Sequence, residues 1–308
     1  MRFTLGPNQY GKAGVRLVTV ERDGDRHTVT DLTVASALSG ELDAVHLAGD
    51  NSAVLTTDTQ KNTAYAFARE FGVGEPEAFG LRLARHYVQT QEPIHRARLT
   101  IEQHKWERLV LNGGAAAPHS FVKSGAETRR TRVTVTEEAI QISSGLGDLT
   151  VLNSTDSEFH GYPVDQYTTL PETTERILAT SVDAWWDHDL TETAPDSIDW
   201  AAMDWGKAYA DAKDAMLAAF VETYSYSLQQ TLFQMGSRIL ATVPSVAEVR
   251  LSLPNKHHNL VDLSSFGLDN PNQVYVAPTE PYGLIQGTVR RDGAPSAAVL
   301  GGPGGSEW

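Results

Sequence analysis

An amide and an imidazole stand two residues apart in the second half of the chain, at Asn255 and His257. Both fall in a segment, 246–257, whose alternation of apolar and polar residues predicts a β-strand. Because side chains two apart on a strand share a face, Asn255 and His257 would be presented together, which suits ligand recognition, while His258 would face away. The alternative is a polar strand end that enters a turn.

A second candidate is the run Thr56-Thr57-Asp58, which precedes a predicted helix over 59–71. Thr and Asp are favoured N-cap residues, so capping alone would explain the run. A helix N-terminus also offers backbone N–H donors and the positive end of the helix dipole to an anionic ligand. Lys12, Arg176 and Gln229 could each donate to such a ligand, but each, taken singly, is typical of a solvated surface side chain.

The sequence contains no motif typical of a metal site or of a nucleotide-binding site. The chain has no cysteine, which excludes disulfides, thiolate metal ligands and cysteine nucleophiles. The pair His257-His258 cannot readily bind one ion, because neighbouring strand side chains point to opposite faces. His-x-His, His-Glu-x-x-His, Gly-x-Gly-x-x-Gly, Walker and Gly-x-Ser-x-Gly motifs are missing as well. We therefore expect neither a metal nor a nucleotide-bound cofactor.

Composition narrows the range of partners. The 308 residues include 39 acidic and 25 basic side chains, a formal charge of −14, and such a surface repels nucleic acid. No run of about 18 apolar residues predicts a transmembrane helix, the N-terminus lacks the apolar run of a signal peptide, and the C-terminal Ser306-Glu307-Trp308 is not a Ser-Lys-Leu peroxisomal signal. We expect a cytoplasmic protein with no nucleic-acid or membrane partner, in which a few local cations would hold any anionic ligand.

The elements that must position these residues recur in the same order in two halves of the chain. Sequence patterns in the first half predict strands over 15–22, 27–38, 44–56 and 95–109, with helices over 59–71 and 76–89 before the last strand. The second half repeats this order, with strands over 131–136, 139–144, 148–153, 176–186 and 246–257 and with helices over 200–225 and 228–241. Strands followed by two helices and a final strand, repeated, indicate an α+β protein with antiparallel sheets and helices on one face.

The repeat suggests a division of the chain. We expect one domain over 1–113 and a second over 114–292, joined near a Gly- and Ala-rich linker at 113–118. The remaining segment, 293–308, is rich in Gly, Pro, Ala and Ser and is expected to be a disordered tail.

The sheet faces turned away from the helices are polar. In the predicted strand 95–109, Arg96, Arg98 and Glu102 alternate with an apolar face, so the uncovered side would line a wet space or another subunit. Exposed strand edges would be closed if neighbouring subunits paired them into a barrel. The pattern therefore favours an oligomer.

Seven short motifs occur in the order in which urate oxidases carry them. They are Tyr10-Gly11-Lys12; Thr56-Thr57-Asp58 with Lys61-Asn62-Thr63; Ser157-Glu158-Phe159-His160-Gly161; Asp165-Gln166-Tyr167-Thr168-Thr169-Leu170; Arg176-Ile177-Leu178; Leu228-Gln229; and Leu253-Pro254-Asn255-Lys256-His257. Seven ordered matches are far more specific than any one of them, and they span roughly residues 9–291. The chain therefore resembles the urate oxidase (uricase) family over nearly its whole length.

This resemblance implies two tandem tunnelling-fold (T-fold) domains, each an antiparallel four-stranded sheet backed by a helix pair. In the family, subunits pair their sheets into a barrel and two barrels stack into a homotetramer, with active sites at subunit interfaces. The reaction that it implies oxidises urate with molecular oxygen and water to 5-hydroxyisourate and hydrogen peroxide. No metal or flavin is needed, because the deprotonated purine is itself the reductant.

The resemblance also assigns the residues that would bind urate. Arg176 and Gln229 would clamp one edge of the purine, since a guanidinium fork supplies paired donors to an anion and a carboxamide offers both a donor and an acceptor. Phe159 would stack on the flat ring. The backbone around Leu228 would hydrogen-bond the same ligand.

The same resemblance assigns proton transfer and oxygen binding to a second set of residues. Lys12 and Thr57, assisted by His257, would form a proton relay that deprotonates bound urate. Thr57 and Asp58 would arrive from the neighbouring subunit and close the site. Asn255 with Thr57 would hold oxygen, and later water, over the purine face.

Two positions depart from the common family pattern, and neither carries a named chemical role. Leu228 stands where many relatives have Val, and His160 stands where Trp is common, behind the stacking ring. Two other functions would fit a T-fold chain: an enzyme acting on a pterin-like heterocycle, and a catalytically silent purine-binding protein. Zinc-using T-fold enzymes need histidine clusters that this sequence lacks, and a silent protein could lose Lys12 or His257, which are both present.

Overall fold

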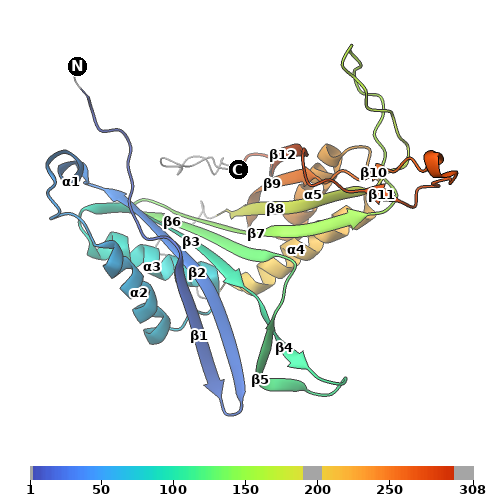
Figure 1. Ribbon diagram of the computed structural model, residues 1–308. Helices are drawn as coiled ribbons and strands as arrows, with labels where there is room; N and C mark the ends of the chain where they lie inside the picture. Colours follow the sequence, from blue (N-terminus) through green and yellow to red (C-terminus); the bar gives the residue numbers. More distant parts are fainter. Residues whose placement is uncertain (1–2, 190–202, 295–308) are drawn as a thin grey trace.

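The computed structural model describes residues 3–189 and 203–294. Within them, one eight-stranded antiparallel sheet runs in the spatial order β1-β2-β3-β6-β7-β8-β9-β12 (Figure 1). Its strands are β1 (Val15–Asp23), β2 (Arg26–Gly40), β3 (Ile94–His104), β6 (Thr128–Thr136), β7 (Ile140–Asn153), β8 (Leu178–His188), β9 (Val246–Asn255) and β12 (Gly283–Arg290). The two halves of the sequence thus share a single sheet, joined where β3 pairs with β6, and the predicted division at residue 113 stays a prediction.

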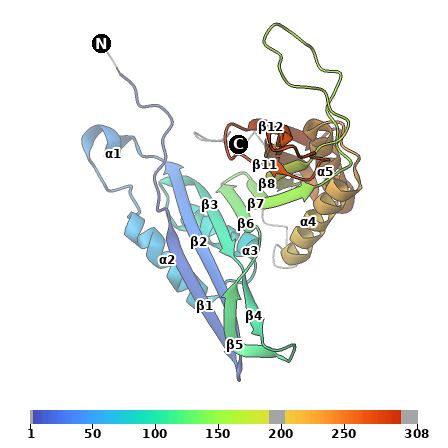
Figure 2. The same cartoon turned by 45° about the vertical axis from the view of Figure 1, so that its right-hand side comes forward.

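Two helix pairs lie behind this sheet, one for each half (Figures 1 and 2). The first pair is α2 (Thr57–Glu70) and α3 (Pro76–Thr90), and the second is α4 (Trp205–Glu222) and α5 (Leu228–Thr242). Helix α3 packs on β3 and β6, while α5 packs on β9 and β12. The predicted α+β class, an antiparallel sheet backed by helix pairs, is confirmed.

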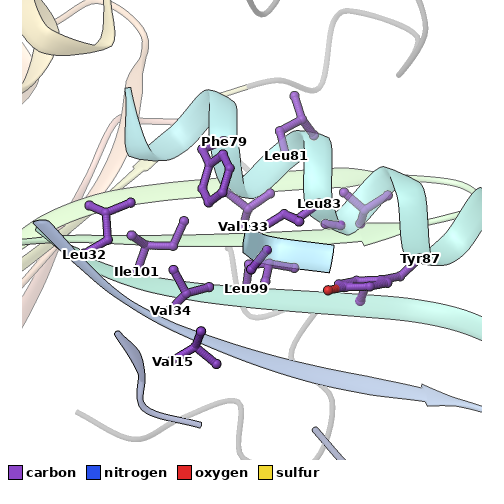
Figure 3. Packing of buried hydrophobic residues seen from close by; sticks show 14 of the residues in the cluster. Val15, Leu32, Val34, Phe79, Leu81, Leu83, Tyr87, Leu99, Ile101 and Val133 are labelled. Atoms are coloured by element: carbon purple, nitrogen blue, oxygen red, sulfur yellow. The ribbon is translucent and has the colours of Figure 1, made fainter. Parts of the chain in front are cut away.

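The first core lies between α3 and the centre of the sheet (Figure 3). Phe79 and Leu83, one turn apart on α3, are both fully buried and point toward Leu99 and Ile101 of β3 and Val133 of β6. Burial of each such side chain contributes about 1.5–3 kcal/mol relative to exposure. Alternation on β3 therefore places its apolar face under the helices, as the sequence predicts.

The second core forms in the same way under α5. The predicted stripe of Leu228, Leu232, Met235 and Ile239 is buried, with Leu232 the most exposed at 6%. It belongs to one apolar cluster with the inward side chains of β8 and β9, which include Trp186, Val249, Leu251 and Leu253. The period of 3.6 residues in this segment thus sets the face that α5 buries.

One predicted strand is wrong. The segment 44–56 contains a short helix, α1 (Asp43–Ala48), followed by turns. Gly49 ends this helix in the left-handed region, at φ 71°, and its N–H bonds to the carbonyls of Ala44 and Val45. The apolar run is too short for its spacing to distinguish a helix from a strand. The glycine C-cap favours the helix, because it satisfies carbonyl groups at the helix end.

The predicted linker at 113–118 is part of a β-hairpin instead. Strand β4 (Trp106–Val110) pairs with β5 (Ala116–Lys123) in a separate two-stranded sheet. Asn112 and Gly113 turn the chain between them with φ of 55° and 68°, values that Asn and Gly tolerate best. The long predicted strand 95–109 is accordingly interrupted at Lys105 and divides into β3 and β4.

Three further segments differ from the prediction. The expected strands 139–144 and 148–153 are one strand, β7, whose pairing shifts register between Leu146 and Leu149 around Asp148 at φ 68°. The edge strand β12 was missed. The predicted helix start at 200 lies outside the described residues, and α4 begins at Trp205, where Asp204 caps it by accepting from Lys207 N at 2.9 Å. Most of the predicted tail, residues 295–308, also lies outside them.

The sheet face turned away from the helices carries charge, as predicted. Arg130 of β6 pairs with Asp183 of β8, and Arg250 of β9 pairs with Asp187 of β8. Asp187 is buried, and the loss of solvation raises the pKa of its carboxyl despite the nearby Arg250. Closure of this face into a barrel between subunits stays a prediction.

Candidate active site

Phe159 and Arg176 are brought together by two short antiparallel segments that lead into β8. Phe159 and Thr173 exchange backbone hydrogen bonds of 2.8 and 3.1 Å, and Arg176 N donates to Ser157 O at 2.9 Å. The Arg176 side chain is anchored as well, because its Nε donates to Ser157 Oγ at 3.0 Å. Its guanidinium carbon lies 5.3 Å from the centre of the Phe159 ring.

This pair combines a cation with an aromatic face. Both side chains are half-buried, and desolvation lowers the pKa of Arg176, although a guanidinium stays charged at physiological pH. The Nη atoms stay available for a second partner after Nε has bonded Ser157, so the fork can meet an anion beside the ring. Tyr162 stacks on Phe159 with ring centres 5.0 Å apart and planes tilted by 20°.

The N-terminus of α5 reaches the same place. Ser227 caps the helix by accepting from Gln230 N at 3.2 Å, and Glu158 N donates to Ser225 O at 2.9 Å. Leu228 is buried at 2% exposure, whereas the side chain of Gln229 is exposed and can reach a ligand. Phe159, Arg176 and Gln229 thus belong to one neighbourhood at the beginning of β8 and α5.

Asn255 lies at the same end of the sheet, but the local structure of His257 differs from the prediction. Strand β9 ends at Asn255, which is paired with Thr180 of β8, and Lys256 N donates to Ala179 O at 2.8 Å. His257 follows outside the strand and is exposed. Strand alternation therefore does not set the His257 side chain beside Asn255, because β9 is two residues shorter than expected.

Lys12, Thr57 and Asp58 form a second group in the first half of the chain. The backbone of Lys12 exchanges bonds with Ser36, through N to Oγ at 3.2 Å and through O from Ser36 N at 2.8 Å. Ser36 Oγ in turn donates to Gln60 Oε1 of α2 at 2.6 Å. This chain of bonds ties the Lys12 segment to the first turn of α2, where Thr57 and Asp58 stand.

Thr56, the residue before α2, caps this helix, and charged side chains lie at its first turn. Thr56 Oγ1 accepts from Thr59 N at 3.0 Å, so the capping role expected for this run is filled by Thr56. Lys61, hydrogen-bonded to the exposed Asp58, lowers the pKa of that carboxyl most, and the charge of Lys12 lowers it further. Thr57 is thereby left with no capping duty and can serve a ligand.

The two groups lie in opposite halves of the chain. Figures 1 and 2 show α2, with the Lys12 segment beside it, at the blue end of the sheet and α5, β8 and β9 at the other. The structure of one chain therefore assembles Phe159, Arg176, Gln229 and Asn255 on one side. It does not bring Lys12, Thr57 and Asp58 to them within the described residues.

Comparison with known proteins identifies the family. A family model described as Uricase matches residues 8–134 and 142–286. The uricase of Arthrobacter globiformis is 45% identical over 293 residues, covering 95% of this chain and 92% of its own, and the uricase of Aspergillus flavus is 38% identical over 290 residues, covering 92% and 95%. The chain belongs to the uricase family.

Solved uricases also share the fold. The crystal structure of uricase from Arthrobacter globiformis superposes with a TM-score of 0.88 at 44% identity, covering 96% of this chain and 98% of that one. The urate oxidase of Bacillus sp. TB-90 gives a TM-score of 0.77 at 25% identity, covering 92% and 100%. Family membership therefore extends over the whole described fold, both groups of candidate residues included.

The sequence reasoning missed several residues of this candidate site. Ser157, which anchors Arg176, and Tyr162, which stacks on Phe159, are local and stand inside or next to quoted motifs, so spacing could have suggested them. The contact of Glu158 with Tyr224 could not be found in this way, because the two residues lie 66 positions apart in the chain.

Across 3–189 and 203–294, no group of three or more His, Asp or Glu side chains is arranged to hold a metal ion. In the same residues, no helix combines the length and the apolar character needed to cross a membrane.

Proposed function

We propose that this member of the uricase family oxidises urate with molecular oxygen. The observation that carries the proposal is the arrangement of Arg176 over Phe159 beside the start of α5, in a chain whose relatives are uricases. Urate is a flat purine that is anionic at neutral pH, and this arrangement offers it an aromatic face and a cationic fork. The two alternatives, a pterin enzyme and a silent purine binder, lack comparable support because the matched family and relatives are all uricases.

Binding follows from the chemistry of the first group. The ring of Phe159 offers a stacking surface, the Nη atoms of Arg176 offer two charge-assisted donors, and the amide of Gln229 supplies a donor and an acceptor along the same edge. The backbone N–H of Leu228, at the first turn of α5, has no acceptor within the helix and can complete the set. In a chain of net charge −14, Arg176 provides the local positive charge that an anion needs.

Chemistry in this proposal combines the second group with Asn255 and His257. Lys12 and Thr57, with His257, remove a proton from bound urate, which makes the purine electron-rich enough to reduce oxygen. Asn255 and Thr57 hold oxygen, and later water, over the ring. Urate, oxygen and water give 5-hydroxyisourate and hydrogen peroxide: oxygen takes two electrons from the purine and two protons, and water supplies the new hydroxyl at C5. The chain contributes positioning and electrostatics, with no metal or flavin.

Assembly completes the site in the same proposal. Because Lys12, Thr57 and Asp58 lie in the half opposite Arg176 (Figure 1), we infer that Thr57 and Asp58 reach the urate site of a neighbouring subunit. The unpaired edges of β1 and β12 and the charged sheet face support closure of two sheets into a barrel, and two barrels into a homotetramer. We propose the cytoplasm as the compartment.

Oxygen uptake tests the function directly. Purified chain, treated with chelator and free of flavin, is expected to consume oxygen, release hydrogen peroxide and bleach the absorbance of urate. Neopterin should give none of these changes. Inert chelated protein that regains turnover when a metal is added would refute the cofactor-free mechanism, and turnover of neopterin but not of urate would refute the substrate.

A further inference from the structure

A buried carboxylate stands directly beside the stacking ring. Glu158 is 8% exposed, and its two oxygens have separate partners. Oε1 accepts from Nε2 of His160 at 3.0 Å, and Oε2 accepts from the hydroxyl of Tyr224 at 3.2 Å. Burial of a carboxylate costs free energy unless such donors hydrogen-bond to it. The buried position of Glu158 therefore calls for a structural explanation.

The partners of Glu158 belong to two different segments of the site. His160 follows Phe159 directly, whereas Tyr224 lies in the connection between α4 and α5. The backbones of the two segments also pair, because Glu158 N donates to Ser225 O at 2.9 Å and Ser225 N donates to Asp156 O at 2.9 Å. Glu158 thus lies across the joint between the two segments.

Each segment carries one wall of the urate site. The first holds the ring of Phe159, and the second leads within four residues of Ser225 to Leu228 and Gln229 at the start of α5. A planar ligand that stacks on the ring and is clamped at its edge needs a fixed distance between these walls, because an error of about 1 Å is enough to weaken such recognition. The side-chain bonds of Glu158 add to the backbone pairing at this point.

We propose that Glu158 is a positioning residue, which holds the Phe159 wall at a fixed spacing from the Gln229 clamp and thereby sets the affinity for the purine. The inference rests on the proposed function, since it takes these two side chains as the ligand walls. Glu158 itself touches no substrate. Its effect is on binding, equally in the ground state and the transition state, so it appears in KM more than in kcat.

The test compares variants that remove the bonds to different degrees. Glu158→Leu removes both at similar volume, Glu158→Gln keeps hydrogen-bonding capacity without the charge, and Tyr224→Phe removes one donor. Glu222→Leu is the matched control, because Glu222 lies two residues before Tyr224 and pairs with Arg238 at the exposed surface. For each variant we would measure KM and kcat with urate, the Kd for xanthine by calorimetry, and the thermal unfolding midpoint.

Glu158→Leu should raise KM and the xanthine Kd about tenfold, equivalent to ~1.4 kcal/mol, with kcat within about twofold of the parent. Glu158→Gln and Tyr224→Phe should raise both constants less, and Glu222→Leu should leave them unchanged. Should Glu158→Leu fail to fold, Tyr224→Phe carries the test. Folded variants with parental KM and Kd, or with lowered kcat alone, would overturn the positioning role while leaving the function intact. A parent chain that neither oxidises urate nor binds xanthine would overturn both.

Discussion

At Arg176 a single guanidinium has two tasks, which use different atoms. Nε is fixed to Ser157 Oγ at 3.0 Å, and this bond sets the plane of the fork above the Phe159 ring. The two Nη atoms then face outward in a defined direction. A lysine would keep the positive charge but would lose both the anchor and the paired donors, so the two residues are not equivalent at this position.

Arg176→Lys should therefore raise KM for urate about 10- to 100-fold, because bonds to a charged ligand contribute about 1.5–3 kcal/mol. Arg82→Lys is the matched control, since Arg82 also lies over a phenylalanine ring, 5.2 Å from the centre of Phe71, but far from the site in sequence and on α3. Steady-state kinetics with urate measures both. Equal KM values for the two variants would show that charge alone, and not the fork, binds the substrate.

At the scale of the elements, the buried joint between the two halves depends on polar contacts as well as on apolar packing. Glu77 of α3 is fully buried and accepts from Arg129 Nη2 at 2.8 Å, Thr131 Oγ1 at 2.9 Å and Ser144 Oγ at 2.7 Å. Ser144 also contacts His188 Nε2 at 3.2 Å, which joins β7 and β8 to this network.

The imidazole of His188 gives this joint a predictable pH dependence. Complete burial against the Trp205 ring lowers the pKa of His188 from 6.5 to about 4. Protonation therefore favours the unfolded chain: the stability from neutral His188 is fully present above pH 6.5 and is lost as pH falls toward 4. The maximal loss is about 3 kcal/mol, from ~1.4 kcal/mol per pKa unit.

Denaturant unfolding between pH 8 and 4 checks this expectation. Stability of the parent should fall more steeply below pH 6.5 than that of His188→Gln, whose absolute stability is lower because the ring contact with Trp205 is gone. His95→Asn, at an exposed imidazole 3.5 Å from Glu41, should follow the parent. Parallel profiles for the parent and His188→Gln would mean that this imidazole does not control acid stability.

The length of a sequence pattern determines which elements could be predicted. The α5 stripe and the alternation of β3 extend over ten residues or more, so their buried faces were correctly predicted. Within 44–56, the apolar residues at 44–48 form too short a run to distinguish a strand from α1, and β12 has Gly at 283 and 287, which weakens a strand pattern. Glycine at 287 has a packing reason visible only in the fold, since a Cβ there would lie 2.9 Å from Leu232.

At the scale of the whole molecule, the order of motifs names the candidate residues but does not show where one chain places them. Phe159, Arg176 and Gln229 meet because β8 and α5 begin at the same end of the sheet, which no local spacing reveals. Lys12 and Thr57 are held together by Ser36 and Gln60 at the opposite half. We propose that a second copy of the chain brings the two groups together.

Mixing two inactive variants tests this need for a second copy. Arg176→Gln impairs the first group and Thr57→Ala impairs the second, so each homo-oligomer should be nearly inactive. If each site takes Thr57 from one chain and Arg176 from its neighbour, randomly mixed oligomers should regain about a quarter of wild-type activity, because half of the chains supply each intact group. The two variants are mixed after dissociation into subunits, and in the control the intact homo-oligomers are combined without dissociation. Activity that returns only after dissociation reports the exchange of subunits between the variants. Should mixed oligomers form without regaining activity, both groups must act within one chain, and the fold would have to bring its two halves together around urate.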